Sequence, residues 1–127
     1  EVYMYAPETL MPKEIEKLGA HVCRSMEEAI EGAHCVMGLR IQLERQKGGL
    51  FPSLSEYSRF YGVKDGMLAL ADKDAIIMHP GPVNRGIELT PSLIDGDNSV
   101  ICEQVTNGLS VRMAILTLLK EYREKNL

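Results

Sequence analysis

Residues 75–88 read AIIMHPGPVNRGIE, an apolar run that leads directly into two prolines on either side of one glycine. Residues 75–78 have the length and composition of a strand. Proline fixes one backbone dihedral angle and lacks the N–H donor, so residues 79–82 form a stiff segment that can present carbonyl oxygens to a ligand. A connection that only had to turn would need one Pro or one Gly. The stretch therefore predicts a strand whose carboxyl end holds backbone atoms in fixed positions, although alone it also fits a rigid connection to the next helix.

Strand-like and helical segments alternate along the rest of the chain. The expected strands are residues 2–6, 21–23, 35–39 and 75–78. The expected helices are residues 12–18, 25–31, 54–61, 64–70 and 90–96, followed by 100–125 with a break near 107–108. This alternation predicts an α/β fold with a mostly parallel sheet, flanked by helices on both faces in a Rossmann-like three-layer arrangement.

The composition is that of an ordinary globular domain, and it limits the kinds of partner that we expect. The net charge of -4 gives no reason to expect nucleic acid or an anionic membrane surface as a partner, and no apolar run is long enough to cross a bilayer. The three cysteines and three histidines lack the spacing of metal ligands, so we expect reduced thiols, a cytoplasmic location and no metal site. We expect no cofactor, because no glycine-rich dinucleotide or phosphate loop follows a strand.

Two polar segments follow predicted parallel strands, at residues 40–52 and from residue 79 onward. The carboxyl ends of parallel strands meet at one edge of a sheet, where ligands of such folds bind. If the strand continues, Arg40, Gln42 and Glu44 point to the same side. A guanidinium can hold a carboxylate through two parallel hydrogen bonds, an amide can read an amino or carboxylate group, and Glu44 could hold Arg40. We favour a binding role for Arg40 and Gln42.

The segment after the second strand leaves more alternatives open. A lone histidine such as His79 is more often a core or capping residue than a catalyst. Asn84, Arg85 and Glu88 could bind a ligand or could equally brace the loop through local hydrogen bonds.

Taken together, these stretches resemble the C-terminal, aspartate-binding half of the aspartate carbamoyltransferases. The matching stretches are MGLRIQLER at 37–45, SEY at 55–57, HPGPVNRGIE at 79–88, QVTNG at 104–108 and VRMA at 111–114. They cover most of the chain from residue 37 onward. The sister family, the ornithine carbamoyltransferases, typically has H-C-L-P in place of residues 79–82, which argues against that family.

The resemblance implies a reaction and a set of roles. The carbamoyl group of carbamoyl phosphate would pass to the amine of L-aspartate, giving N-carbamoyl-L-aspartate and phosphate in de novo pyrimidine biosynthesis. Arg40 would bind a carboxylate of L-aspartate, and Gln42 would help to orient the substrate. The backbone carbonyls of Gly81 and Pro82 would accept hydrogen bonds from the attacking amine and the carbamoyl NH2 group. Catalysis would rest on positioning and electrostatic stabilisation.

The resemblance also implies supporting groups behind the substrate contacts. Glu44 would orient Arg40, and His79 would be a second residue behind the substrate contacts. The proline loop of this family further implies a cis peptide bond between Gly81 and Pro82.

The resemblance is partial, since the family's carbamoyl-phosphate domain and the first strand–helix unit of its aspartate domain have no counterpart here. We therefore expect residues 1–127 to form a partial aspartate-binding domain whose sheet lacks a central strand and which is inactive without the N-terminal half. Expected partners are that half and further subunits in a homotrimer or higher assembly, with regulatory or dihydroorotase chains as possible additions. The alternative is a non-catalytic amino-acid-binding or regulatory α/β module.

Overall fold

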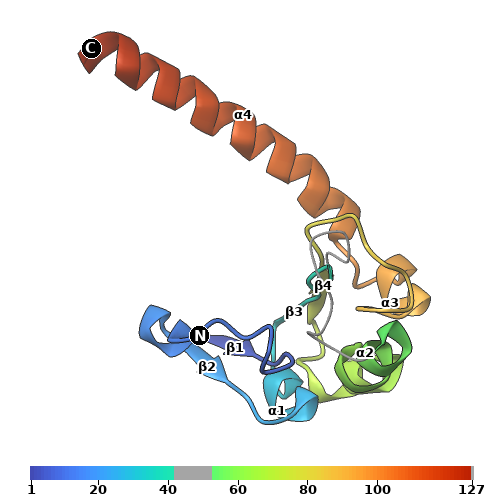
Figure 1. Cartoon of the computed structure of the whole chain (residues 1–127). Helices are drawn as coiled ribbons and strands as arrows, with labels where there is room; N and C mark the ends of the chain where they lie inside the picture. The colour runs from blue at the N-terminus through green and yellow to red at the C-terminus, as the bar shows by residue number, and fades with distance from the viewer. Residues whose placement is uncertain (42–52, 127) are drawn as a thin grey trace.

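The computed structural model describes residues 1–41 and 53–126, and its strands pair in parallel. Strand β1 (Val2–Met4) pairs with β2 (Ala20–Val22), and β3 (Cys35–Met37) pairs with β4 (Ile76–Met78). Within the described residues these pairs are two separate two-stranded sheets (Figure 1). Helices pack around the strands, so the predicted α/β class with parallel strands is confirmed.

The helical elements follow the predicted order. They are η1 (Ile15–Leu18), α1 (Met26–Ile30), α2 (Leu54–Tyr61), η3 (Asp65–Leu70), α3 (Pro91–Asp95) and α4 (Ile101–Asn126). Two predicted caps are present, because the hydroxyls of Ser25 and Ser53 each accept a backbone N–H three residues later, both at 3.1 Å.

Two predicted helix boundaries are wrong. The helix expected from residue 12 is only the short 3-10 turn η1, because Glu14 before it adopts a left-handed conformation with φ 65° that an α-helix cannot contain. The break expected near Asn107 and Gly108 is absent, and α4 runs unbroken through 26 residues. One glycine in a helix costs only about 1 kcal/mol relative to alanine, which so long a helix can absorb.

The hydrophobic core lies around β3 and β4. Ile77 and Leu89 are each only 1% exposed and stand at its centre. The buried cluster draws on α1, β3, β4, α3, the first turn of α4 and the segments that follow α2 and β4. It consists of Met26, Ile30, Val36, Val63, Ile77, Leu89, Leu93 and Ile101. The core therefore fixes the positions at which β3 and β4 end.

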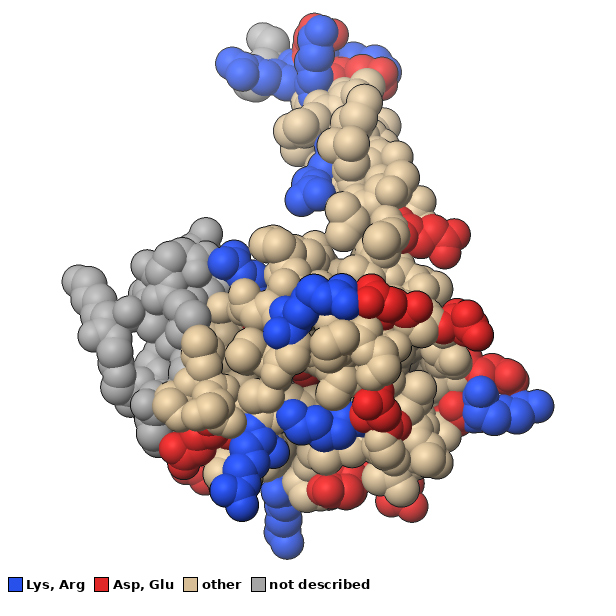
Figure 2. All heavy atoms as spheres, turned by 90° about the vertical axis from the view of Figure 1, so that its right-hand side faces the viewer, with Lys and Arg blue, Asp and Glu red and all other residues tan. Residues whose placement is uncertain are grey.

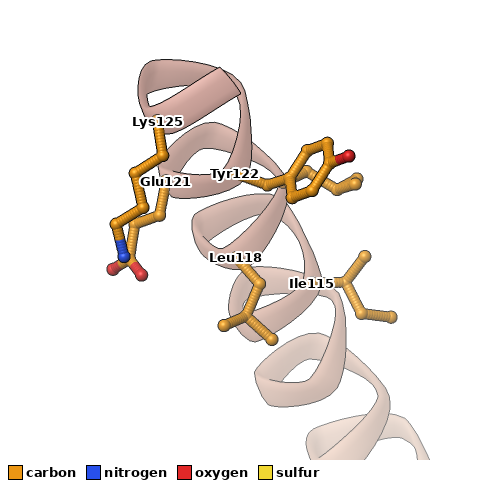
Figure 3. Close-up of a pocket in the computed structure, with 6 residues that line it drawn as sticks. Ile115, Leu118, Glu121, Tyr122 and Lys125 are labelled. Atoms are coloured by element: carbon orange, nitrogen blue, oxygen red, sulfur yellow. The ribbon is translucent and has the colours of Figure 1, made fainter.

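Helix α4 projects from this body, and most of it contacts no other described part of the chain (Figure 1). Residues 109–126 are exposed throughout, although several are large and apolar. Figure 2 shows this stretch as a largely uncharged stem with charged side chains at its tip. A shallow hollow beside Ile115, Leu118 and Tyr122 is lined by α4 side chains alone (Figure 3). Across the described part of the chain, no helix has the length and apolar character needed to span a membrane.

Candidate functional site

The chain segments that follow β3 and β4 leave the sheet side by side. The two strands pair in the register Cys35–Ile76 and Met37–Met78, and just beyond them the Gly38 N–H donates to the Met78 carbonyl at 3.0 Å. A Cβ at Gly38 would lie 3.0 Å from the Leu89 side chain, so a larger residue here would require Leu89 to shift. The prediction that both segments start at the same edge is confirmed, for the first segment as far as residue 41.

Glu88 joins these two segments through hydrogen bonds. Its buried carboxylate accepts the Ile41 N–H at 3.0 Å, the Asn84 N–H at 2.9 Å and the Asn84 Nδ2 group at 2.7 Å. Asn84 Nδ2 also donates to the Ile41 carbonyl at 3.3 Å. Glu88 and Asn84 thus brace the loop, one of the two alternatives that the sequence leaves open.

Arg85, the third residue of that group, points elsewhere. Its guanidinium pairs with the Asp95 carboxylate, and Nη1 donates to Oδ1 at 3.0 Å. The guanidinium lowers the pKa of Asp95. Both side chains are largely exposed, so this pair contributes little to stability.

His79 lies fully buried beneath the proline loop. Its backbone N–H donates to Gln104 Oε1 at 2.8 Å, and its Nδ1 accepts the Gly81 N–H at 2.9 Å, which leaves the proton of the neutral ring on Nε2. Burial lowers the pKa of His79, and the charge of Arg40 lowers it further, against an opposing effect of Glu88. His79 is therefore neutral near pH 7, and its imidazole holds the backbone of the loop.

The proline loop itself has the geometry that the resemblance implies. The Gly81–Pro82 peptide bond is cis, and Gly81 has φ 67°. This left-handed conformation favours glycine, and a Cβ there would also lie 3.2 Å from Val105 of α4. Pro82 is exposed, so this end of the loop is open to a ligand.

Arg40 is half-buried and immediately precedes Ile41, which the Glu88 and Asn84 contacts hold. Arg40 follows Gly38 by two residues, and the Gly38 N–H donates to the carbonyl of Met78, the residue directly before His79, so the Arg40 backbone lies near the start of the proline loop. Gln42 and Glu44, the other predicted site residues, lie outside the described residues. No group of side chains suited to a metal ion occurs within residues 1–41 and 53–126.

Sequence reasoning left the roles of Glu88 and Gln104 undecided or unnoticed. Gln104 lies 25 residues after His79, and Glu88 lies 47 residues after Ile41. The sequence shows only that both residues are polar. It does not identify the group to which either of them bonds.

The buried state of His79 predicts a pH dependence of stability. Below about pH 6.5, the ordinary pKa of histidine, the unfolded chain binds a proton that the folded chain does not bind until lower pH. We therefore expect the free energy of unfolding to fall with decreasing pH in this window, by at most about 1.4 kcal/mol per pH unit for this group. Urea unfolding at a series of pH values should show a shallower slope for His79→Asn. His34→Asn, at an exposed site, is the matched control and should keep the wild-type slope, whereas equal slopes for all three proteins would contradict the assignment.

Comparison with known proteins identifies the family. The family model of the Asp/Orn-binding domain of aspartate/ornithine carbamoyltransferases matches residues 3–119. The chain belongs to this family of carbamoyltransferases. It is 61% identical over 119 residues to the aspartate carbamoyltransferase catalytic subunit of Ruminiclostridium cellulolyticum, covering 94% of this chain and 38% of that protein. The catalytic subunit of Acetivibrio thermocellus is 60% identical, with the same coverage.

Solved carbamoyltransferase structures share the fold. Ornithine carbamoyltransferase from Thermus thermophilus aligns with a TM-score of 0.77 at 22% identity, over 94% of this chain and 39% of that chain. Aspartate transcarbamoylase from Trypanosoma cruzi, in complex with carbamoyl aspartate and phosphate, aligns with a TM-score of 0.69 at 26% identity, over 91% and 38%. The carbamoyltransferase chain described here thus spans about two-fifths of the length of the relatives it matches.

Proposed function

We propose that the chain is the aspartate-binding part of an aspartate carbamoyltransferase catalytic subunit. The observation that carries this proposal is the set of hydrogen bonds from Ile41 to Glu88 and Asn84. They tie the backbone next to Arg40 to the segment that follows the cis Gly81–Pro82 bond. A guanidinium suits the extra carboxylate of L-aspartate and would repel the side-chain ammonium of ornithine. The names of the relatives at 61% and 60% identity support the same substrate.

In the proposed reaction, the neutral amine of L-aspartate attacks the carbamoyl carbon of carbamoyl phosphate. The new C–N bond forms as the bond between carbon and the phosphate oxygen breaks, and the amine proton passes to the departing phosphate. Arg40 binds a substrate carboxylate, Gln42 helps to orient the substrate and Glu44 orients Arg40. The carbonyls of Gly81 and Pro82 accept hydrogen bonds from the amine and the carbamoyl NH2 group, so that both reactants are aligned.

His79 contributes to this reaction through the loop. It accepts the Gly81 N–H and is itself held through its own N–H by Gln104 of α4. Its neutral imidazole therefore keeps the Gly81 peptide in place without adding a charge beside Arg40.

The remainder of the enzyme is part of the proposal. Residues 1–127 form a partial aspartate-binding domain, completed by a carbamoyl-phosphate half and by a strand that joins β1 to β3. The two separate sheets and the exposed apolar side chains of α4 support this, because both leave surface that further protein would cover. The complete enzyme acts in pyrimidine biosynthesis in the cytoplasm as a homotrimer or higher assembly.

A reconstitution experiment tests the proposed function. The chain is mixed with carbamoyl phosphate and L-aspartate, with and without the N-terminal part of the Ruminiclostridium cellulolyticum catalytic subunit that this chain does not match. We expect carbamoyl aspartate to form only when that part is added. L-aspartate binding without turnover in the reconstituted assembly would instead favour the alternative, a non-catalytic amino-acid-binding or regulatory module.

A further inference from the structure

We propose that Glu88 is a positioning residue for the substrate-binding guanidinium. Its carboxylate fixes the peptide group between Arg40 and Ile41, and thereby sets where Arg40 stands relative to the proline loop. This inference rests on the proposed function. It assigns the orientation of Arg40 to Glu88, a buried residue in the segment that follows β4.

The backbone of Glu88 provides a rigid base for this role. Its carbonyl accepts the Val63 N–H at 2.9 Å, and Val63 in turn accepts the Thr90 N–H at 3.3 Å. The next residue, Leu89, is 1% exposed in the centre of the core. The side chain of Glu88 therefore starts from a fixed point and reaches toward the Ile41 peptide.

The hydrogen bonds of Glu88 and Asn84 hold Ile41 on both sides. The Ile41 N–H belongs to the peptide group that also contains the carbonyl of Arg40, and this N–H donates to Glu88 Oε1 at 3.0 Å. The Ile41 carbonyl, on the following peptide, accepts Asn84 Nδ2 at 3.3 Å. With the Ile41 side chain buried at 4% exposure, the backbone directly after Arg40 has little freedom to move.

A role confined to bracing the proline loop would not need the contact with Ile41. Asn84 lies four residues before Glu88 and already supplies two donors, at 2.9 and 2.7 Å. Glu88 is only 3% exposed, and a carboxylate so far from water is stable only when hydrogen bonds satisfy it. The third donor comes from the Arg40 segment, 47 residues away in sequence. The same buried charge thus sets the spacing between the two substrate-binding segments.

The first test is Glu88→Gln in the reconstituted enzyme. The amide keeps the shape of the side chain but puts an NH2 group in place of one carboxylate oxygen. Two of the three hydrogen bonds are lost if it replaces Oε1, which accepts the Ile41 N–H and Asn84 Nδ2, and one is lost if it replaces Oε2. Because a hydrogen bond to a charged group is at stake, we expect the KM for L-aspartate to rise by about tenfold or more. The KM for carbamoyl phosphate should change by less than about twofold, since Arg40 does not bind that substrate. The matched control is Glu31→Gln at an exposed site, which should retain both wild-type values.

A second measurement reports on the contact without relying on activity. Amide hydrogen exchange of the reconstituted protein, followed by mass spectrometry, should show faster exchange at Ile41 in Glu88→Gln than in the wild type or in Glu31→Gln. If Glu88→Gln does not assemble, Asn84→Ala is used, because it leaves the buried carboxylate with both backbone donors. We expect this variant to shift the KM for L-aspartate in the same direction by a smaller factor.

The outcomes separate the two proposals. An inactive wild-type assembly would overturn the proposed function, while unchanged exchange at Ile41 would overturn the hold of Glu88 on that peptide. An active wild type with an unchanged KM for L-aspartate in Glu88→Gln would overturn the positioning role. Equal rises in both KM values would do the same, since they would indicate a general loss of structure.

Discussion

Replacing Arg40 with alanine should lower kcat/KM for L-aspartate by on the order of 10²- to 10⁴-fold in the reconstituted enzyme. The estimate follows from the loss of two charge-assisted hydrogen bonds to a substrate carboxylate, each worth about 1.5–3 kcal/mol. The KM for carbamoyl phosphate should change by less than about threefold, because in the proposed enzyme the other half binds the phosphate. Steady-state kinetics with each substrate varied in turn provides the measurement.

Two further variants make this result specific. Arg40→Lys keeps the charge but loses the planar pair of donors, so its kcat/KM should fall between those of the wild type and Arg40→Ala. Arg24→Ala removes an exposed arginine before α1 and should leave the kinetics unchanged. Aspartate kinetics in Arg40→Ala equal to those of Arg24→Ala would remove Arg40 from the site.

Placing charges on the apolar stem of α4 should abolish reconstitution. Ile115 and Leu119 lie one turn apart and are 50% and 59% exposed, which is unusual for large aliphatic side chains in the absence of a partner. We expect Ile115→Glu with Leu119→Glu to reduce the activity recovered on adding the N-terminal half by more than about 100-fold, because burying an unpaired carboxylate costs several kcal/mol. Titration of one half against the other, with activity as the readout, measures this loss.

The control for the α4 variant is Lys120→Glu, which changes charge on the same helix at a position that is already polar and exposed. Circular dichroism should show the same helix content in all three proteins, since Ile115 and Leu119 are both exposed in the described structure. Full recovery of activity by the doubly charged variant would show that the stem stays uncovered in the enzyme.

Much of the fold follows from local rules that the sequence displays. The hydroxyls of Ser25 and Ser53 cap the helices that they were expected to begin, and the alternation of strands and helices predicts which strand ends share an edge. The helix break predicted at Gly108 is wrong, because the small cost of one glycine is outweighed by the 25 other residues that form α4. Local patterns thus predict whether a segment is a helix or a strand better than they predict where it begins and ends.

The candidate site was predictable only in part, for a physical reason. Arg40 and Gly81 follow strands, and the rule for parallel sheets brings them to one edge. Which residue accepts the Ile41 N–H depends on the distance between two loops after packing. Here it is Glu88, and no local pattern encodes that distance. The hydrogen bond between Gln104 of α4 and the His79 N–H likewise depends on how α4 packs against the loop.

Because α4 is unbroken, a single helix connects the proline loop to the projecting tip. With 26 residues at 1.5 Å each, the helix is a rod of ~39 Å. At its base, Gln104 holds His79, and Val105 lies against Gly81. A partner that binds the tip of α4 would therefore bind the same helix that supports the loop at residues 81 and 82.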